Sequence, residues 1–219
     1  MINNKKHIIF DWNGPLIDDA WIFVDVLNQL LIPRGLNKIS LQEYRDAFCF
    51  PIKLFYKKLG VDISEQSFMK LEEEFVHEYN KRMYKPALFD NVLNFLKQLI
   101  ENGVSLSILS ASNEGVLCKL VKHYALENYF DYVVGVNNYG ANGKVESGEN
   151  LLHKINLKKS EIIMIGDTDY DYDVATSLQL DCILKTGGHQ SLNRLQIKTK
   201  NTISSFDEIA INNYFKYRL

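Results

Sequence analysis

Short runs of aliphatic residues recur along the chain, and each run is followed by polar residues. The runs show no regular alternation of apolar and polar positions, which is typical of strands covered on both faces. Between them lie segments with apolar residues three and four positions apart, as in amphipathic helices. The five predicted strands are residues 8–10, 104–109, 132–136, 162–165 and 182–184. This alternation predicts an α/β fold, a doubly wound parallel sheet with helices on both faces and a Rossmann-like core.

The segment from residue 16 to residue 85 has a different pattern, because it contains helical stretches and no convincing strand. Predicted helices begin at about residue 18, after Pro51 and near Ser64. We therefore expect residues 1–15 and 86–219 to form the α/β core and residues 16–85 to form an inserted, all-helical cap. Both connections between the two parts are candidate hinges, and closure of the cap would exclude water from the core.

The composition and charge exclude several functional classes. With 46% hydrophobic and 24% charged residues, the chain is typical of a globular protein and not of a disordered one. A net charge of −2 supplies neither the basic surface of a nucleic-acid-binding protein nor a polybasic membrane patch. The longest apolar segment is interrupted by polar residues, so no membrane helix is predicted. We expect a cytoplasmic protein, and the sequence does not indicate its oligomeric state.

The cysteines support a reducing compartment. Cys49, Cys118 and Cys182 are odd in number, and no two of them form a Cys-x-x-Cys pair. This arrangement argues against a disulfide framework and against a zinc site.

Four polar features follow predicted strands, and ligands bind at the carboxyl ends of the strands in open parallel sheets. They are Asp11 in the segment 10–16, Ser110, Lys144 after Gly143, and the aspartate-rich segment that begins at Gly166-Asp167. A carboxylate can act as a nucleophile, a hydroxyl can donate to phosphate, and a lysine is a compact charge that suits phosphate. Four aspartates within seven residues would repel one another unless a cation lay among them.

Each feature taken alone also has a simpler interpretation. Asn13-Gly14 is typical of a tight turn, Ser110 of a helix N-cap, and Lys144 of a solvated loop. Helix capping would explain Asp169 or Asp171, but not all four aspartates. The segment is not an EF-hand loop, because Tyr172 stands where that loop requires glycine.

Taken together and in this order, the features resemble the haloacid dehalogenase superfamily, in particular its phosphoglycolate phosphatase-like branch. The family's motifs match residues 11–15, Ser110, Lys144, and the set Gly166, Asp167, Thr168, Asp171 and Ala175. The helical insertion after the first motif resembles the family's cap, and residues 16–18 and 128–135 resemble the phosphoglycolate phosphatase branch.

The resemblance implies a role for each matched residue. Asp11 would attack phosphorus and form an aspartyl phosphate. A Mg²⁺ would be bound by the carboxylates of Asp11 and Asp167 and by the main-chain carbonyl of Asn13. Ser110 and Lys144 would bind the phosphoryl oxygens, with Lys144 expected as the only cation near the carboxylates.

The resemblance also implies a supporting residue and a substrate class. Asp171 would orient Lys144 or a water molecule bound to the metal. The substrate would be a small phosphorylated metabolite, and neither nucleic acid nor a membrane is expected as a partner.

The sequence departs from the family pattern at two positions. Where phosphatases of the family place an acid-base aspartate, this chain has Asn13, whose amide neither gives nor takes a proton near pH 7. Such a group is worth roughly 10²–10⁴ in rate, so activity should persist on acyl and aryl phosphates, whose leaving groups need no proton. Pro15 replaces a threonine and stiffens the turn. If another residue supplies the acid, Asp18 and Asp19 are the first candidates, although capping of the first cap helix also explains them.

Three other functions stay open. Phosphonoacetaldehyde hydrolases also lack the second aspartate and form a Schiff base on a cap lysine, a position that Lys53 could supply. Haloacid dehalogenases attack carbon without a metal, which the intact Gly166-Asp167 motif disfavours. A non-enzymatic phosphate-binding or regulatory pseudophosphatase would result if Asn13 had disabled the chemistry.

Overall fold

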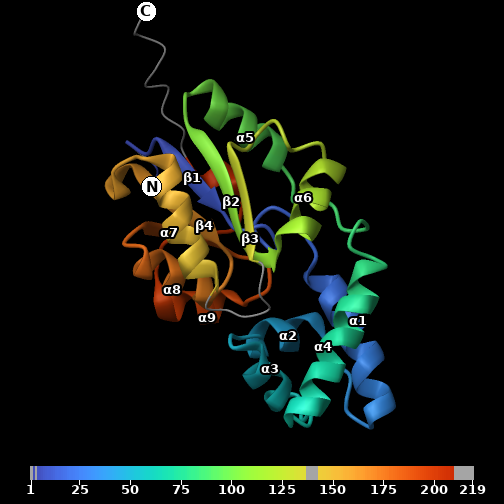
Figure 1. Cartoon of the computed structure of the whole chain (residues 1–219). Helices are drawn as coiled ribbons and strands as arrows, with labels where there is room; N and C mark the ends of the chain where they lie inside the picture. Colours follow the sequence, from blue (N-terminus) through green and yellow to red (C-terminus); the bar gives the residue numbers. More distant parts are fainter. Residues whose placement is uncertain (1, 3, 137–142, 210–219) are drawn as a thin grey trace, which may run out of the picture.

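The computed structural model describes residues 2, 4–136 and 143–209, and its centre is a single parallel sheet (Figure 1). The strands are β1 (His7–Phe10), β2 (Ser105–Asn113), β3 (Tyr132–Val136), β4 (Ile162–Gly166), β5 (Asp181–Lys185) and β6 (Thr202–Ile203). Their order across the sheet is β3-β2-β1-β4-β5-β6. The direction of winding therefore reverses at β1, as in a doubly wound fold. The predicted α/β class and parallel sheet are confirmed.

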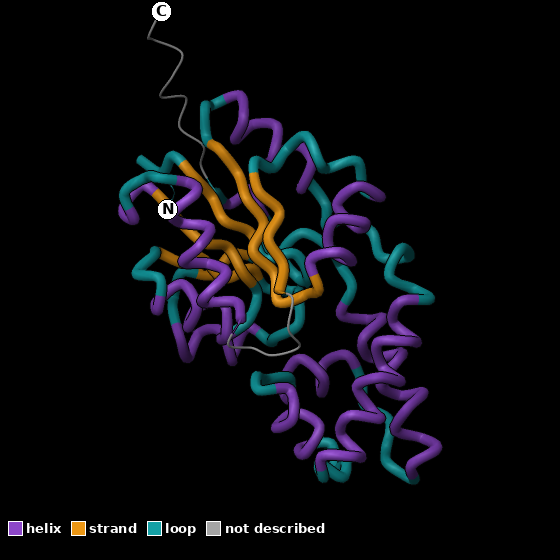
Figure 2. Tube along the Cα trace, viewed as in Figure 1, coloured by secondary structure: helices purple, strands orange, loops and turns teal. Residues whose placement is uncertain are grey.

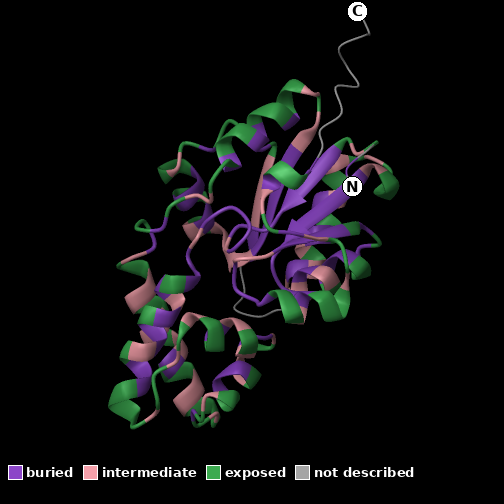
Figure 3. Cartoon of the chain, turned by 180° about the vertical axis from the view of Figure 1, so that it is seen from behind, coloured by how far each residue is buried: buried purple, intermediate pink, exposed green. Residues whose placement is uncertain are grey.

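Helices cover both faces of this sheet. The helices that follow residue 85 are α5 (Val92–Glu101), α6 (Glu114–His123), α7 (Gly143–Ile155), α8 (Asp169–Ser177) and α9 (Leu192–Lys198). In Figure 1, α5 and α6 lie on one side of the sheet, and α7, α8 and α9 lie on the other. Both faces of the central strands are therefore buried, as Figure 3 shows, which explains their continuous apolar sequences.

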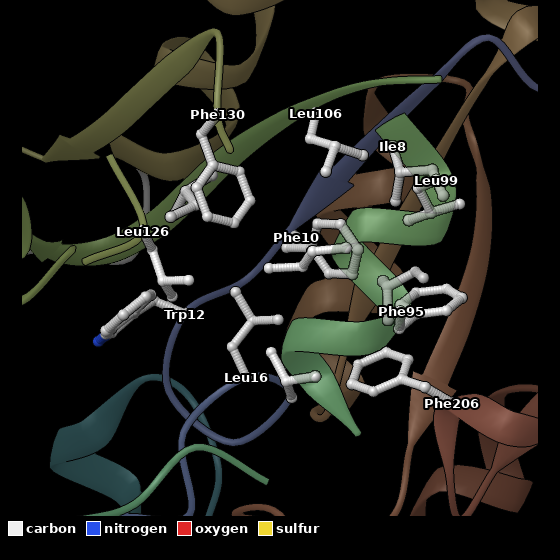
Figure 4. Close-up of a cluster of buried hydrophobic side chains, with 14 of the residues drawn as sticks. Ile8, Phe10, Trp12, Leu16, Phe95, Leu99, Leu106, Leu126, Phe130 and Phe206 are labelled. Atoms are coloured by element: carbon white, nitrogen blue, oxygen red, sulfur yellow. The ribbon is translucent and has the colours of Figure 1, made fainter. Parts of the chain in front are cut away.

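Successive residues of β1 contribute to two separate hydrophobic clusters. Ile8 and Phe10 point to the α5–α6 side, whereas Ile9 packs on the α7–α9 side. Figure 4 shows the first cluster, in which the Phe10 ring lies 6.3 Å from Phe95 and 6.2 Å from Phe206, measured between centroids. This packing fixes the position of the end of β1, and Asp11, the first candidate site residue, comes directly after it.

The segment between β1 and α5 is helical and has its own hydrophobic cluster. It contains α1 (Ala20–Leu31), α2 (Leu41–Ala47), α3 (Ile52–Lys58) and α4 (Glu65–Asn80). Figure 2 shows these helices grouped beside the carboxyl ends of the strands. Buried residues from Ala20 to Leu71 pack on one another in this group. This separate hydrophobic cluster supports a cap that is distinct from the core. The predicted boundaries, 1–15 and 86–219 for the core and 16–85 for the cap, stay a prediction. Residues 1, 3, 137–142 and 210–219 lie outside the described part of the chain.

The two connections to this helical group lie side by side. The Asp18 N–H donates to the Ala87 carbonyl at 2.9 Å, and the Phe89 N–H donates to the Leu16 carbonyl at 3.0 Å. An isolated bridge also joins Ile17 to Leu88. These contacts hold the chain segment that enters the helical group against the segment that leaves it. Within the described part of residues 16–85, no strand enters the central sheet.

Two local expectations about Ser110 were wrong. The strand β2 does not end before Ser110 but runs to Asn113, with a shift of register after Leu109. The N-cap of α6 is Asn113, whose side chain accepts from the Val116 N–H at 3.2 Å. Ser110 therefore lies in the irregular end of β2, where capping does not explain it.

In the described part of the chain, no helix has both the length and the apolar composition that crossing a membrane requires.

Candidate active site

The polar residues predicted from the sequence meet at the carboxyl edge of the sheet. Asp11 follows β1, Ser110 lies in the last part of β2, and Asp167 follows β4. Carboxylate oxygens of Asp11, Asp167 and Asp171 lie within 4.8 Å of one another, and all three residues are buried. The structure thus brings together three carboxylates from two neighbouring strands and the helix α8.

Lys144 lies in the first turn of α7 and is only 1% exposed. Its Nζ donates to Asp11 Oδ1 at 2.8 Å and to Asp171 Oδ1 at 2.7 Å. Burial alone would lower the pKa of Lys144, but the two carboxylates outweigh it and raise that pKa. Lys144 is therefore a buried, charged group between two aspartates and not a solvated loop residue.

Asp171 uses its two carboxylate oxygens for different purposes. Oδ1 accepts from Lys144, while Oδ2 accepts from the Thr168 N–H at 3.0 Å, the Thr168 hydroxyl at 2.6 Å and the Asp167 N–H at 3.2 Å. Thr168 is the N-cap of α8, and Asp171 completes its capping box. Burial would raise the pKa of Asp171, but Lys144 and these hydrogen bonds hold it below its ordinary value. Both interpretations of Asp171, capping and orientation of Lys144, agree with this geometry.

Asp167 is the least compensated carboxylate in the site. Its Oδ2 accepts from the His189 N–H at 2.5 Å, whereas its Oδ1 is buried and has no hydrogen-bond partner among the described residues. Burial therefore raises the pKa of Asp167 well above its ordinary value, against the opposing effect of His189. Burial likewise raises the pKa of Asp11 to about 6, although Lys144 opposes the shift.

Two glycines allow the backbone to approach Asp167 closely. A Cβ atom on Gly14 would lie 2.0 Å from Asp167 Oδ2, and one on Gly188 would lie 2.2 Å from the same oxygen. Gly14 also has φ of +91°, which side chains rarely adopt. The chain thus forms a narrow cradle around a carboxylate that has one unpaired oxygen. A buried carboxylate oxygen that lacks a partner fits a hard divalent cation such as Mg²⁺.

The amide of Asn13 is fixed by three side chains. Its Nδ2 donates to Asp19 Oδ2 at 2.5 Å and to the Tyr79 hydroxyl at 3.2 Å. Its Oδ1 accepts from the Ser112 hydroxyl at 3.0 Å. The side chain is therefore held in one orientation, and it has no proton that it can exchange near pH 7.

Sequence reasoning missed a second cation, His189, and misplaced the contacts of Asp19. Asp19 stands at the N-cap of α1 but makes no capping hydrogen bond. Instead, its fully buried carboxylate lies 3.1 Å from His189 Nε2. Burial would lower the pKa of His189, but Asp19 and the other site carboxylates raise it to about 9. Lys144 is thus not the only cation near the carboxylates. His189 belongs to no sequence motif, and the only signal in the sequence that could have indicated its role is its position shortly after the end of a strand.

A cavity of about 440 Å³ opens between the core and the helical segment. Its core end is lined by site residues that include Asp11, Asn13, Ser110 and Lys144. Its other end is lined mainly by aromatic side chains, together with Lys53 from α3 and Glu72 from α4. This volume is within the range of small-molecule sites.

Comparison with known proteins agrees with this geometry. The family model of the haloacid dehalogenase-like hydrolases matches residues 8–185. The phosphoglycolate phosphatase of Rhodobacter capsulatus is 23% identical over 187 residues, which cover 84% of this chain and 85% of that protein. The pyrophosphatase PpaX of Halalkalibacterium halodurans is 21% identical, with 75% of each chain covered.

A solved structure supports the same fold. A haloacid dehalogenase-like hydrolase from Streptococcus pneumoniae superposes with a TM-score of 0.79 at 18% identity, covering 94% of this chain and 96% of that one.

Proposed function

This chain belongs to the haloacid dehalogenase-like hydrolase family and is a phosphatase of its phosphoglycolate phosphatase-like branch; from this we propose a Mg²⁺-dependent reaction through an aspartyl phosphate on Asp11. The substrate would be a small phosphorylated metabolite bound in the cavity between core and cap. The observation that supports this most is the buried Oδ1 of Asp167, which lies beside Asp11 and Lys144 and has no partner in the described part of the chain. The cytoplasmic location stays a prediction from the sequence.

Asp11 has the position and environment of a nucleophile. Its carboxylate would attack phosphorus while the bond from phosphorus to the leaving oxygen breaks. Water would then attack the aspartyl phosphate, breaking the bond to Asp11 and releasing inorganic phosphate. Lys144, held by Asp11 and Asp171, would also stabilise the charge on the phosphoryl oxygens, and the Ser110 hydroxyl would donate to one of them.

The residues that would hold Mg²⁺ are the carboxylates of Asp11 and Asp167 and the main-chain carbonyl of Asn13. When bound, the ion would neutralise the carboxylates and polarise the phosphoryl group. Because Asn13 cannot donate a proton to the leaving oxygen, the enzyme would favour phosphates whose leaving oxygen is stable as an anion.

The test is hydrolysis of acetyl phosphate with and without Mg²⁺. We expect turnover that depends on Mg²⁺ and is abolished in Asp167→Ala, with weaker Mg²⁺ binding in that variant. The matched control is Asp173→Asn, which changes an exposed aspartate of the same segment and should keep the activity. Unchanged turnover in Asp167→Ala would show that the metal assignment is wrong.

Asn13 also favours a second candidate, a non-enzymatic phosphate-binding module. That function predicts Mg²⁺-assisted phosphate binding without turnover of acetyl phosphate. A phosphonatase that uses Lys53, a lining residue of the cavity, would instead give a borohydride-trapped adduct with an aldehyde substrate. The same preparation of protein can separate the three functions.

A further inference from the structure

The aromatic end of the cavity limits the substrate that the site can accept. Phe23, Phe48, Phe50, Phe68 and Phe75 all line it. Phe50 from the cap also lies 4.5 Å from Tyr170 of α8, between ring centroids, so aromatic rings from both parts of the molecule border the cavity. Such walls favour a flat, apolar group, because aromatic rings prefer offset and edge-to-face contacts.

The missing acid limits the leaving group independently. Without proton donation, the departing oxygen must leave with the electron pair of the phosphorus–oxygen bond. A phenol has a pKa of about 10, whereas an aliphatic alcohol is nearly as weak an acid as water, whose pKa is about 16. Asn13 therefore permits departure of a phenolate much more readily than departure of an alkoxide.

Two charged side chains in the aromatic end, Lys53 and Glu72, lack hydrogen-bond and ion-pair partners among the described residues. The Lys53 Nζ lies over the Phe68 ring, 5.4 Å from its centroid, which is its nearest described contact of this kind. Burial raises the pKa of Glu72, which is only partly exposed. Half-buried charges of opposite sign without partners suit a ligand that carries both charges.

From these observations we infer that the substrate is an aryl phosphate monoester with a zwitterionic amino-acid end, of which O-phospho-L-tyrosine is the simplest example. The phosphoryl group occupies the site of Asp11 and Lys144, and the ring lies among the aromatic side chains. The carboxylate faces Lys53, and the ammonium faces Glu72. This inference rests on the proposed phosphatase function and names the substrate class of the same cavity.

The experiment measures kcat/KM with Mg²⁺ for one acyl phosphate and three phosphate esters. Acetyl phosphate needs no acid and has no ring, phenyl phosphate adds the ring, O-phospho-L-tyrosine adds both charges, and O-phospho-L-serine has the charges on an alkyl ester. We expect O-phospho-L-tyrosine to exceed phenyl phosphate by about tenfold. It should exceed O-phospho-L-serine by roughly 10²-fold or more, the value of a missing acid.

Variants test the two charges by the ratio of kcat/KM for O-phospho-L-tyrosine to that for phenyl phosphate. Lys53→Met and Glu72→Gln should each lower this ratio about tenfold. Lys57→Met and Glu73→Gln, exposed neighbours on the same helices, should keep the ratio of the natural protein. Melting temperatures of all four variants show whether they are folded.

The outcomes separate this inference from the function on which it rests. If acetyl phosphate is hydrolysed but phenyl phosphate is no better than O-phospho-L-serine, the aryl class is wrong and the phosphatase function stands. If the charged ester is no better than phenyl phosphate, or if the ratio is the same in all variants, the amino-acid end is wrong. If none of the four compounds is hydrolysed, the phosphatase function itself fails.

Discussion

Asn13 joins the turn after Asp11, the proposed nucleophile, to a buried polar network. Its amide donates to Asp19, and Asp19 also contacts His189, whose main-chain N–H donates to Asp167. The network thus runs from the position of the missing acid to the proposed metal ligand. An aspartate introduced at position 13 would meet the Asp19 carboxylate, because the present hydrogen bond is only 2.5 Å long. Two like charges at that distance disfavour each other.

Asn13 and Asp19 offer a substitution that tests the missing acid. Asn13→Asp combined with Asp19→Asn keeps one carboxylate and one amide in the network. We expect this double variant to raise kcat/KM for alkyl phosphates about 10²–10⁴-fold and to leave kcat/KM for acetyl phosphate nearly unchanged. Asn13→Asp alone should gain less, because Asp19 opposes ionisation of the new carboxylate. Steady-state rates on O-phospho-L-serine and acetyl phosphate measure the difference, and lower alkyl phosphatase activity in the double variant would contradict this role of position 13.

The sequence was sufficient to place Asp11, Lys144 and the Asp167–Asp171 segment, because parallel strands bring their carboxyl ends to one edge. It was not sufficient for His189 and for the contacts of Asp19. These contacts join residues 170 positions apart, and the partners depend on how the cap packs on the core. A local pattern such as capping explains Asp19 equally well in the sequence, and only the packing excludes it.

Among the helices and loops, α2 makes the main polar contact with the loop after β5. Arg45 donates to the carbonyl of Gly188 at 2.8 Å and to the carbonyl of Gly187. The Tyr44 hydroxyl lies 2.7 Å from His189 Nδ1. Because this loop also carries the N–H that binds Asp167, the position of α2 and the geometry of the site are connected.

We predict that Arg45→Gln weakens the closed arrangement of cap and core. The change removes hydrogen bonds to a charged group, each worth about 1.5–3 kcal/mol, so kcat/KM should fall at least about tenfold. Amide exchange in α2 should become faster in the same variant. Lys38→Gln, an exposed substitution in the same segment, is the control. Equal kcat/KM and equal exchange in both variants would show that α2 does not hold the site closed.

The elements that the sequence failed to predict are short ones. The helix α2 has seven residues, and its capping box between Ser40 and Glu43 is a signal that could have located it. The strand β6 has only two residues and the helix α9 only seven, so each is too short for its apolar positions to repeat recognisably along the sequence. The longer elements were predictable from the sequence. The central strands are buried on both faces and therefore read as continuous apolar runs, and the longer helices bury one clear apolar stripe.

The carboxylates of Asp11 and Asp167 are buried in the folded protein, and their burial makes the free energy of unfolding depend on pH. Asp11 has a folded-state pKa of about 6, above its ordinary 3.8. Its contribution to stability is therefore complete below about pH 4 and is lost as the pH rises through 6. The raised pKa of Asp167 acts in the same direction. A bound cation would offset this loss, because it favours the ionised carboxylates.

We predict that Mg²⁺ raises the melting temperature more at pH 8 than at pH 5. Protons compete with the ion at low pH, and binding to the folded state alone stabilises it by mass action. Thermal unfolding at both pH values, with and without Mg²⁺, measures the effect, and Asp167→Ala should reduce it. A shift of equal size at both pH values would contradict the involvement of the buried carboxylates.

The central claim is that Asp11 accepts the phosphoryl group and that no acid-base residue at position 13 speeds its release. The most direct measurement is intact-protein mass spectrometry after rapid acid quenching of the enzyme with phenyl phosphate and Mg²⁺. We predict a phosphoryl adduct that peptide mapping assigns to Asp11. It should be absent in Asp11→Asn and should decay faster in the Asn13→Asp/Asp19→Asn variant. Turnover without any adduct, or an adduct that persists in Asp11→Asn, would contradict the account.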